Sequence, residues 1–258
     1  MITSAQNTQV KNIIKLNQKA KARREQKLFV AEGRKMFLEA PREQLQEVYV
    51  SESFLEKCSC REHLEEVGYE VVSDSVFSKI SDTCTPQGVL CVLKQFHYNI
   101  EEMLRDKAPL FLLLENIQDP GNLGTMLRTG EGAGVSGIIM SRDTVDLYNP
   151  KVIRSTMGSI YRVPFYYADD FAAAVHQVQQ AGVSVYAAHL RGKNSYACQD
   201  YTKGTAFLIG NEGNGLREET AELADCYIRI PMEGKVESLN AAVASSILMY
   251  EAHRQRAI

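Results

Sequence analysis

The sequence predicts an α/β protein whose C-terminal half is built on a mainly parallel sheet. From residue 110 onward, apolar runs of strand length alternate with helix-like segments, a pattern typical of parallel sheets covered on both faces. The run Leu110–Leu114 is apolar at every position, as expected for a strand buried on both sides. Three segments rich in glycine and asparagine follow such runs, at the strand ends where α/β domains bind their ligands.

The N-terminal residues predict a smaller α/β unit that begins with a basic helix. Apolar residues recur at near-helical spacing between residues 9 and 26, with basic residues between them, which indicates an amphipathic helix. After it we expect strands at 28–33, 48–50, 69–72 and 89–93 and helices near 34–40, 52–66 and 74–81. The polar stretch that follows the strand at 89–93 is expected to be a linker with one helical turn at 101–105. The predicted organisation is therefore a small α/β domain with the basic helix at 1–95, a linker at 96–108 and a second α/β domain at 109–258.

The elements expected in the C-terminal domain alternate throughout its length. They are strands at 110–114, 136–141, 162–166, 183–188, 205–209 and 226–230, and helices at 121–133, 149–158, 169–181, 216–223 and 238–255. The last of these helices has few polar positions around its circumference. Such a helix is expected to be buried, either in its own fold or against another subunit.

Composition narrows the class of protein. Hydrophobic residues make up 45% of the 258 residues and charged residues 24%, which is ordinary for a globular protein. No apolar run approaches the ~20 residues that span a bilayer, and the N-terminus lacks the order of a secretory signal, so a cytoplasmic protein is expected. The six cysteines and five histidines show no disulfide framework or metal-ligand spacing. We therefore expect reduced thiols and no metal.

Charge is distributed unevenly along the chain. Residues 1–35 contain nine lysines and arginines against two glutamates, although the whole chain has a net charge of −3. A basic segment on an otherwise acidic protein indicates a local surface for a polyanion. A solvated helix face is the plainer alternative, but the charge imbalance favours nucleic acid. The residues predicted to bind it are Lys11, Lys15, Lys19, Lys21, Arg23, Arg24, Lys27 and Arg34.

The three loops carry the functional signal. They span residues 116–128, 209–216 and 230–240, and none contains the glycine fingerprint of a phosphate-binding or dinucleotide-binding loop. A nicotinamide- or nucleotide-dependent enzyme is thus disfavoured. In the first loop Arg128 follows the turn Asp119-Pro120-Gly121-Asn122 by one to two helical turns, from which it can reach an anion or a hydroxyl.

The second and third loops add polar groups near the same strand ends. Three glycines in residues 210–215 let the backbone approach a ligand closely, and Glu212 either contacts a ligand or satisfies buried backbone donors. In the third loop we expect Ser238 to cap the last helix. Asn240 is expected inside that helix, where a polar side chain needs a partner.

Together and in this order, the three segments resemble the signature motifs of the SpoU (TrmH-type) branch of the SPOUT RNA methyltransferases. The resemblance covers residues 108–258. The segments Phe29–Arg34 and Gln87–Leu90 resemble the small ribosomal-protein-like substrate-binding domain that often precedes this branch. The resemblance implies a trefoil-knotted fold, S-adenosylmethionine as methyl donor, and a ribose 2′-hydroxyl of ribosomal or transfer RNA as acceptor. It also implies a homodimer packed through the knotted domain, with no metal and no membrane.

The same resemblance implies roles for individual residues. Arg128 is assigned to the ribose hydroxyl, where it acts either as a base or as an electrostatic stabiliser of the alkoxide, and both roles stay open. Asn122 and Glu212 are assigned to the acceptor side, and Ser238 and Asn240 to the third loop. The residues implied for the cofactor are His189, Leu208, Ile209, Gly210, Asn211, Ile230, Met232 and Leu239.

One competing interpretation belongs to another class. An RNA-binding or ribosome-assembly protein could keep this fold without catalysis. The presence of all five polar residues of the implied catalytic set argues for an enzyme, because an inactive site has no need of them. Ribosomal RNA is favoured over transfer RNA only by family analogy.

Overall fold

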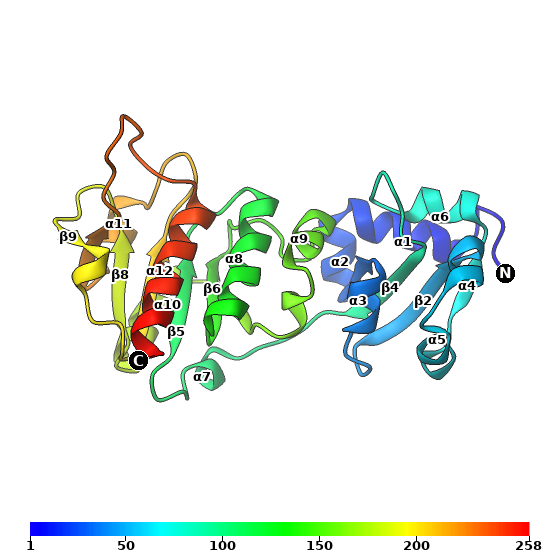
Figure 1. Ribbon diagram of the computed structural model, residues 1–258, viewed down its shortest axis with the longest axis horizontal. Coiled ribbons are helices and arrows are strands. Elements are labelled where there is room, and N and C mark those ends of the chain that lie inside the picture. The colour runs from blue at the N-terminus through cyan, green and yellow to red at the C-terminus, as the bar shows by residue number, and fades with distance from the viewer. Residues whose placement is uncertain (258) are drawn as a thin grey trace. The chain divides into compact units, whose positions relative to one another are not determined.

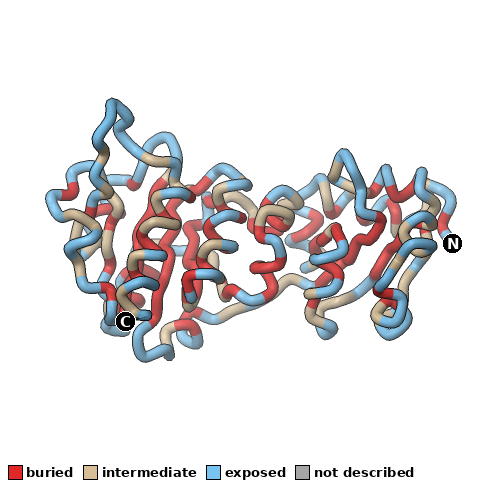
Figure 2. The backbone as a smooth tube through the Cα atoms, viewed as in Figure 1, coloured by how far each residue is buried: buried red, intermediate tan, exposed pale blue. Residues whose placement is uncertain are grey.

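The computed structural model describes residues 1–257, which form two compact units. The first unit comprises Met1–Phe96 together with Asp146–Tyr161, and the second comprises His97–Val145 with Arg162–Ile258. None of the described helices is long and apolar enough to cross a membrane. In both units the strands form a buried layer beneath more exposed helices (Figure 2).

The first unit contains a four-stranded sheet in the order β1-β4-β2-β3. Its strands are β1 (Leu28–Glu32), β2 (Leu45–Ser51), β3 (Glu70–Val72) and β4 (Val89–Lys94). Strand β4 pairs antiparallel with β1 and β2, while β2 and β3 are parallel. The helices are α1 (Thr8–Gln18), α2 (Ala20–Gln26), α3 (Arg34–Leu38), α4 (Glu52–Lys57), α5 (Arg61–Val67) and α6 (Asp74–Ile80). The predicted α/β character of this region is confirmed.

The predicted first helix is interrupted. Lys19 has extended backbone angles and separates α1 from α2, and Val10, Ile13 and Leu16 of α1 pack into the core. Asn7 caps α1, since its side chain accepts hydrogen bonds from the amides of Gln9 and Val10. The single predicted helix at 52–66 is also two helices, separated around Cys58 and Cys60.

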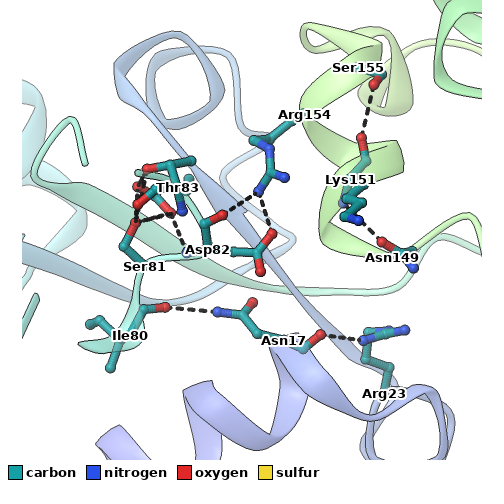
Figure 3. A network of polar contacts seen from close by, with 11 residues as sticks. Asn17, Arg23, Ile80, Ser81, Asp82, Thr83, Asn149, Lys151, Arg154 and Ser155 are labelled. Carbon is teal, nitrogen blue, oxygen red and sulfur yellow. Dashed lines mark hydrogen bonds and ion pairs between the residues drawn. The ribbon is translucent and has the colours of Figure 1, made fainter. Parts of the chain in front are cut away.

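A segment from the middle of the sequence completes the first unit. Helix α9 (Pro150–Thr156) and the short helix η1 (Ser159–Tyr161) pack with it, although the sequence places them within 109–258. Arg154 binds Asp82, at 2.5 Å from its carboxylate (Figure 3), and the hydroxyl of Tyr161 donates to the carbonyl of Met36. Polar contacts therefore attach this segment to the N-terminal sheet and its loops.

The second unit contains a seven-stranded parallel sheet in the order β7-β6-β5-β10-β8-β11-β9. The strands are β5 (Leu110–Leu114), β6 (Gly137–Ser141), β7 (Phe165–Ala168), β8 (Ser184–Ala188), β9 (Asn194–Ser195), β10 (Thr205–Ile209) and β11 (Cys226–Arg229). The predicted parallel sheet is confirmed, and β9 is an edge strand that the sequence analysis did not predict. Every residue of the central strands β5, β6 and β10 is buried, as their continuous apolar runs require.

Helices cover this sheet and complete the unit. They are α7 (Ile100–Met103), α8 (Pro120–Ala133), α10 (Phe171–Gln180), α11 (Glu218–Ala221), α12 (Ala241–Arg256) and the short η2 (Tyr196–Cys198). The helical turn predicted in the linker is confirmed as α7. Helices α8 and α12 lie side by side in Figure 1, and the ideal Cβ position at Gly132 of α8 lies 2.9 Å from the hydroxyl of Tyr250 of α12.

The last helix is only partly buried within one chain. Ala242, Ser245, Leu248, Met249 and Ala252 are buried. Val243 and Tyr250 are each 48% exposed. One side of this largely apolar helix therefore stays open to solvent in the isolated chain.

Candidate active site

The carboxyl ends of β5 and β10 place the first two loops next to each other, because these strands are neighbours in the parallel sheet. Asn116, two residues after β5, has a positive φ of 55°, a conformation that asparagine tolerates better than most residues. Its carbonyl accepts a hydrogen bond of 2.8 Å from the side chain of Asn211, two residues after β10. The two loops are thus joined close to the ends of their strands.

Glu212 is the centre of the contacts between these loops. Its carboxylate accepts hydrogen bonds from the backbone amides of Gln118 (3.1 Å) and Asp119 (3.0 Å) and from the side chain of Asn122 (3.0 Å). Burial alone would raise the pKa of Glu212, but these donors together hold the pKa below its ordinary value. The carboxylate is therefore ionised at neutral pH and fixes the first loop against the second.

The third loop joins the same network through Asn240. The side-chain amide of Asn240 donates a hydrogen bond of 2.9 Å to the side-chain oxygen of Asn122. The side-chain oxygen of Asn240 also accepts from the amides of Ala242 and Val243, which makes it the N-cap of α12. Residues 122, 212 and 240 therefore form one chain of hydrogen bonds across all three loops.

The position of Asn240 corrects two expectations. Ser238 does not cap the last helix, and Asn240 lies at its start rather than inside it. The helix begins at Ala241 because Asn240 has non-helical angles, φ −52° and ψ 140°, the geometry of an N-cap. Ser238 instead lines a cavity with Glu237 and Leu239.

Two cavities adjoin this network. The polar cavity, about 610 Å³, is lined by residues of all three loops, including Asp119, Asn122, Glu212 and Asn240. The apolar cavity, about 300 Å³, lies between the ends of β8, β10 and β11, the third loop and α12. Asn211, Glu212 and Gly213 line both, so the second loop separates one cavity from the other.

Gly210 shows why the second loop needs glycine. A Cβ atom at this position would lie 2.2 Å from the backbone of Gly215 and Leu216, so no other residue fits without moving the chain. Asn211 and Gly215 exchange two backbone hydrogen bonds, of 2.9 and 3.0 Å, and the side-chain oxygen of Asn211 accepts from the amides of Gly213 and Asn214. The loop is a tight, internally bonded turn against the apolar cavity.

The apolar cavity contains most of the residues expected to hold the cofactor. His189, Ile209, Gly210, Asn211, Ile230, Met232 and Leu239 all line it. Leu208 does not, because its side chain points into the buried core of the unit. A mainly apolar lining with backbone groups and a few polar side chains suits adenine and the rest of a nucleoside.

His189 lies at the end of β8 beside this cavity. Its ring nitrogen Nδ1 accepts a hydrogen bond of 3.1 Å from the amide of Arg191, and its ring lies 5.1 Å from that of Tyr227. Partial burial, and then the positive charge of Arg191, lower the pKa of His189. A neutral imidazole is therefore the main form at neutral pH.

Arg128 lies elsewhere on the second unit. It is exposed on α8, about two helical turns beyond Asn122, and lines neither cavity. Among residues 1–257 no hydrogen bond or ion pair occupies its guanidinium. Its own chain thus leaves this group available to an external anion or hydroxyl.

Glu115 is a site residue that the sequence analysis missed. It is 1% exposed at the end of β5, where its carboxylate accepts hydrogen bonds from the amide of Arg217 (2.8 Å) and the hydroxyl of Thr220 (2.5 Å). These contacts fix the chain that leaves the second loop. The signal in the sequence that could have revealed Glu115 is its position, since it is an acidic residue directly after a fully apolar strand.

The basic residues of the N-terminal helices divide into two groups. Arg23 is 3% exposed; it binds Asp146 at 2.6 Å and donates to the carbonyls of Leu16 and Asn17. Its guanidinium is fully engaged, which corrects its assignment to RNA. The others are exposed on the first unit, namely Lys11, Lys15, Lys19, Lys21, Arg24, Lys27 and Arg34.

Comparison with known proteins agrees with this arrangement. The model of the SpoU rRNA Methylase family matches residues 109–250, more than half of the chain. The chain belongs to this family. The model of the MRM3-like substrate binding domain matches residues 7–91. Membership of the SpoU family confirms the resemblance drawn from the three loops.

Individual relatives resemble the chain over nearly its whole length. The 23S rRNA (guanosine(2553)-2′-O)-methyltransferase RlmP of Bacillus subtilis (strain 168) is 34% identical over 252 residues, which cover 96% of this chain and 97% of that protein. An AdoMet-bound rRNA methyltransferase from Sinorhizobium meliloti has a TM-score of 0.84 at 32% identity, covering 98% of this chain and 97% of the other. The SpoU methyltransferase AviRb of Streptomyces viridochromogenes, in complex with AdoMet, has a TM-score of 0.88 at 25% identity, covering 98% and 99%.

Proposed function

We propose that this SpoU family member transfers a methyl group from S-adenosylmethionine to a ribose 2′-hydroxyl of ribosomal RNA. The observation that supports it most is the hydrogen-bonded chain from Glu212 through Asn122 to Asn240, because it joins all three loops around two adjoining cavities. Relatives of nearly the same length are named as rRNA 2′-O-methyltransferases or carry AdoMet. Transfer RNA is the second candidate acceptor.

The donor would occupy the apolar cavity. Its nucleoside would lie against Ile209, Ile230 and Leu239, next to the neutral ring of His189. The residues fit such a group, because the lining is largely apolar and the loop of Gly210–Gly215 presents backbone groups to it. S-adenosylmethionine supplies an activated methyl group on a sulfonium.

The acceptor ribose would lie on the polar cavity. There Glu212 holds Asn122 and Asn122 holds Asn240, and the two amides can position a phosphate or a hydroxyl. The chain's task is to align the hydroxyl with the methyl group and to remove its proton. Arg128 would hold an RNA phosphate with its guanidinium and stabilise the developing alkoxide, whose proton passes to solvent water.

A homodimer would explain the location of Arg128. This residue lies outside both cavities of its own chain, and it belongs to α8, which packs beside α12. A second copy packed over Val243 and Tyr250 would cover that apolar surface. Light scattering tests this proposal: wild type should have twice the mass of one chain, and Val243→Glu should shift it toward the monomer.

RNA would first meet the basic helices of the first unit. Exposed lysines and arginines of α1 and α2 supply a positive surface that suits the phosphate backbone. A knotted chain path through the third loop and a cytoplasmic location complete the proposal.

Labelled S-adenosylmethionine tests the proposed function directly. The protein is incubated with it and with ribosomal or transfer RNA, and the RNA is then digested to nucleosides. The proposal expects label in one 2′-O-methylnucleoside from ribosomal RNA. Label on a base, or none with an RNA that nevertheless binds, would overturn it, and the second result would favour the inactive RNA-binding protein.

A further inference from the structure

The first unit contains a cavity that the reaction does not use. It measures about 340 Å³ and lies between α4, α6 and the loop before β4, at the small end of the range of about 300–1,000 Å³ for small-molecule sites. Its lining combines Phe54 and Phe77 with the charged side chains Lys57 and Asp74. All of its lining residues belong to the first unit.

Gly88 fixes the wall of this cavity. Its φ is +84°, and a Cβ atom there would lie 2.5 Å from Cβ of Phe54 and 2.8 Å from Oγ of Ser51. The loop therefore passes directly against α4, and the ring of Phe54, which is partly exposed, is held at the cavity. A partly exposed aromatic ring can serve as a platform on which a single-stranded base stacks.

Asp74 provides the polar side of the cavity. Its oxygen Oδ1 accepts hydrogen bonds from the hydroxyl (2.7 Å) and the amide (3.2 Å) of Ser53. The hydroxyl of Ser51 and the charge of Lys57 also act on this carboxylate. The hydroxyl and amide of Ser53 lower the pKa of Asp74, so the carboxylate is ionised and can only accept hydrogen bonds.

Positive groups lie beside the cavity. Lys57 lines it, and Gln87, another lining residue, accepts a hydrogen bond of 2.8 Å from the amide of Arg34. The guanidinium of Arg34 binds the hydroxyl of Ser59 at 2.6 Å, two residues beyond Lys57. A nucleotide whose base entered the cavity would have cations close to its phosphate.

We propose that this cavity binds one unstacked guanine of the RNA substrate. The base would stack on Phe54, and its Watson–Crick edge, which presents adjacent N–H donors, would face the carboxylate of Asp74. Uracil offers one N–H between two carbonyl groups and would be repelled by the carboxylate. The inference rests on the proposed function, because it assumes that RNA is the substrate.

Short RNAs test the proposal on the full-length protein. Fluorescence anisotropy would measure the affinity of labelled pentaribonucleotides UUGUU, UUAUU, UUCUU and UUUUU. Wild type is expected to bind the guanine oligonucleotide at least about fivefold more tightly than the uracil one. Equal affinities for all four would overturn the proposal.

Two variants separate the roles of the carboxylate and the ring. Asp74→Asn keeps the size of the side chain and should remove the preference for guanine. Phe54→Ala should weaken binding of all four oligonucleotides. Glu62→Gln is the matched control, since Glu62 is exposed on α5 and does not line the cavity; it should behave as wild type. A guanine preference that survives Asp74→Asn would contradict the proposal.

The same samples distinguish this proposal from the proposed function. Affinity for S-adenosylmethionine and methyl transfer to ribosomal RNA are measured on each variant. If wild type transfers methyl groups but shows no base preference, only the guanine site fails. If it prefers guanine but transfers no methyl group, the guanine site stands and the proposed function fails.

Discussion

Glu212 accepts hydrogen bonds from three partners at once, so its contribution to the free energy of unfolding can be measured. Its folded-state pKa is depressed, because hydrogen bonds from Asn122 and two amides outweigh the effect of burial. A depressed pKa contributes stability that is present above the ordinary value of 4.5 and is lost as the pH falls through the folded-state value. Glu212→Gln should cost about 1 kcal/mol at pH 7, a value reduced by partial solvent exposure.

Denaturant unfolding of wild type and Glu212→Gln between pH 3 and pH 7 checks this prediction. The difference in free energy of unfolding should shrink below about pH 4.5. A difference that stays constant across this range would show that the charge of Glu212 is not what stabilises the loops.

Glu115 is expected to act on the cofactor indirectly. Removing its carboxylate leaves the amide of Arg217 and the hydroxyl of Thr220 without their buried acceptor. Glu115→Ala should therefore lower the free energy of unfolding by about 2 kcal/mol and weaken S-adenosylmethionine binding, while transfer at saturating donor changes little. Thr220→Val, which removes one donor and keeps the shape, is the control and should have a smaller effect on both. Loss of transfer at saturating donor would instead give Glu115 a role in the reaction step.

At the scale of the element, α12 depends on its cap. Asn240→Ala removes two hydrogen bonds to the amides of Ala242 and Val243 and one to Asn122, which should cost about 1 to 2 kcal/mol. Ser238→Ala should have almost no effect on unfolding, because Ser238 is exposed and does not cap the helix. Thermal denaturation of the two variants decides whether Ser238 or Asn240 caps the helix. A larger loss of stability for Ser238→Ala than for Asn240→Ala would contradict the assignment to Asn240.

The break between α1 and α2 gives a second element-scale prediction. Arg23 ties Leu16, Asn17 and Asp146 together from a buried position. Arg23→Ala should lower the free energy of unfolding by about 3 kcal/mol, because it leaves part of a buried ion pair unpaired. Lys21 is exposed, and within residues 1–257 its ion pair is with Glu25 on the same helix, so Lys21→Ala should leave stability unchanged.

Although Lys21 should not affect stability, it should affect the affinity for RNA. Lys21→Ala should weaken RNA binding and reduce its dependence on salt, since one phosphate contact is lost. Filter binding at several salt concentrations measures both quantities. An unchanged affinity would remove α2 from the proposed RNA surface.

At the scale of the whole molecule, the sequence predicts the framework well. Apolar runs such as Leu110–Leu114 identify the buried parallel strands, and the positions of the loops follow from them. The alternation alone does not show that Asp146–Tyr161 packs with the first unit. That association depends on long-range pairs such as Arg154 with Asp82 (Figure 3), which have no local signature.

The same lack of a local signature explains why the sequence predicts some residues of the site correctly and others not. Glycine-rich loops reveal where the backbone must approach closely, as at Gly210. The direction of a side chain depends on the strand pleat, so Ile209 lines the apolar cavity whereas Leu208 points into the core. Charge type alone could not separate the buried Arg23 from its exposed neighbours.

The central claim is that the second and third loops hold the donor, that the first loop joins them on the acceptor side, and that Arg128 serves the acceptor. Calorimetric titration with S-adenosylmethionine, combined with single-turnover methyl transfer on wild type and Arg128→Ala, tests it most directly. The variant should keep its affinity for the donor and lose at least about a hundredfold in the rate of methyl transfer. An equal loss of donor affinity and transfer, or transfer at the wild-type rate, would contradict it.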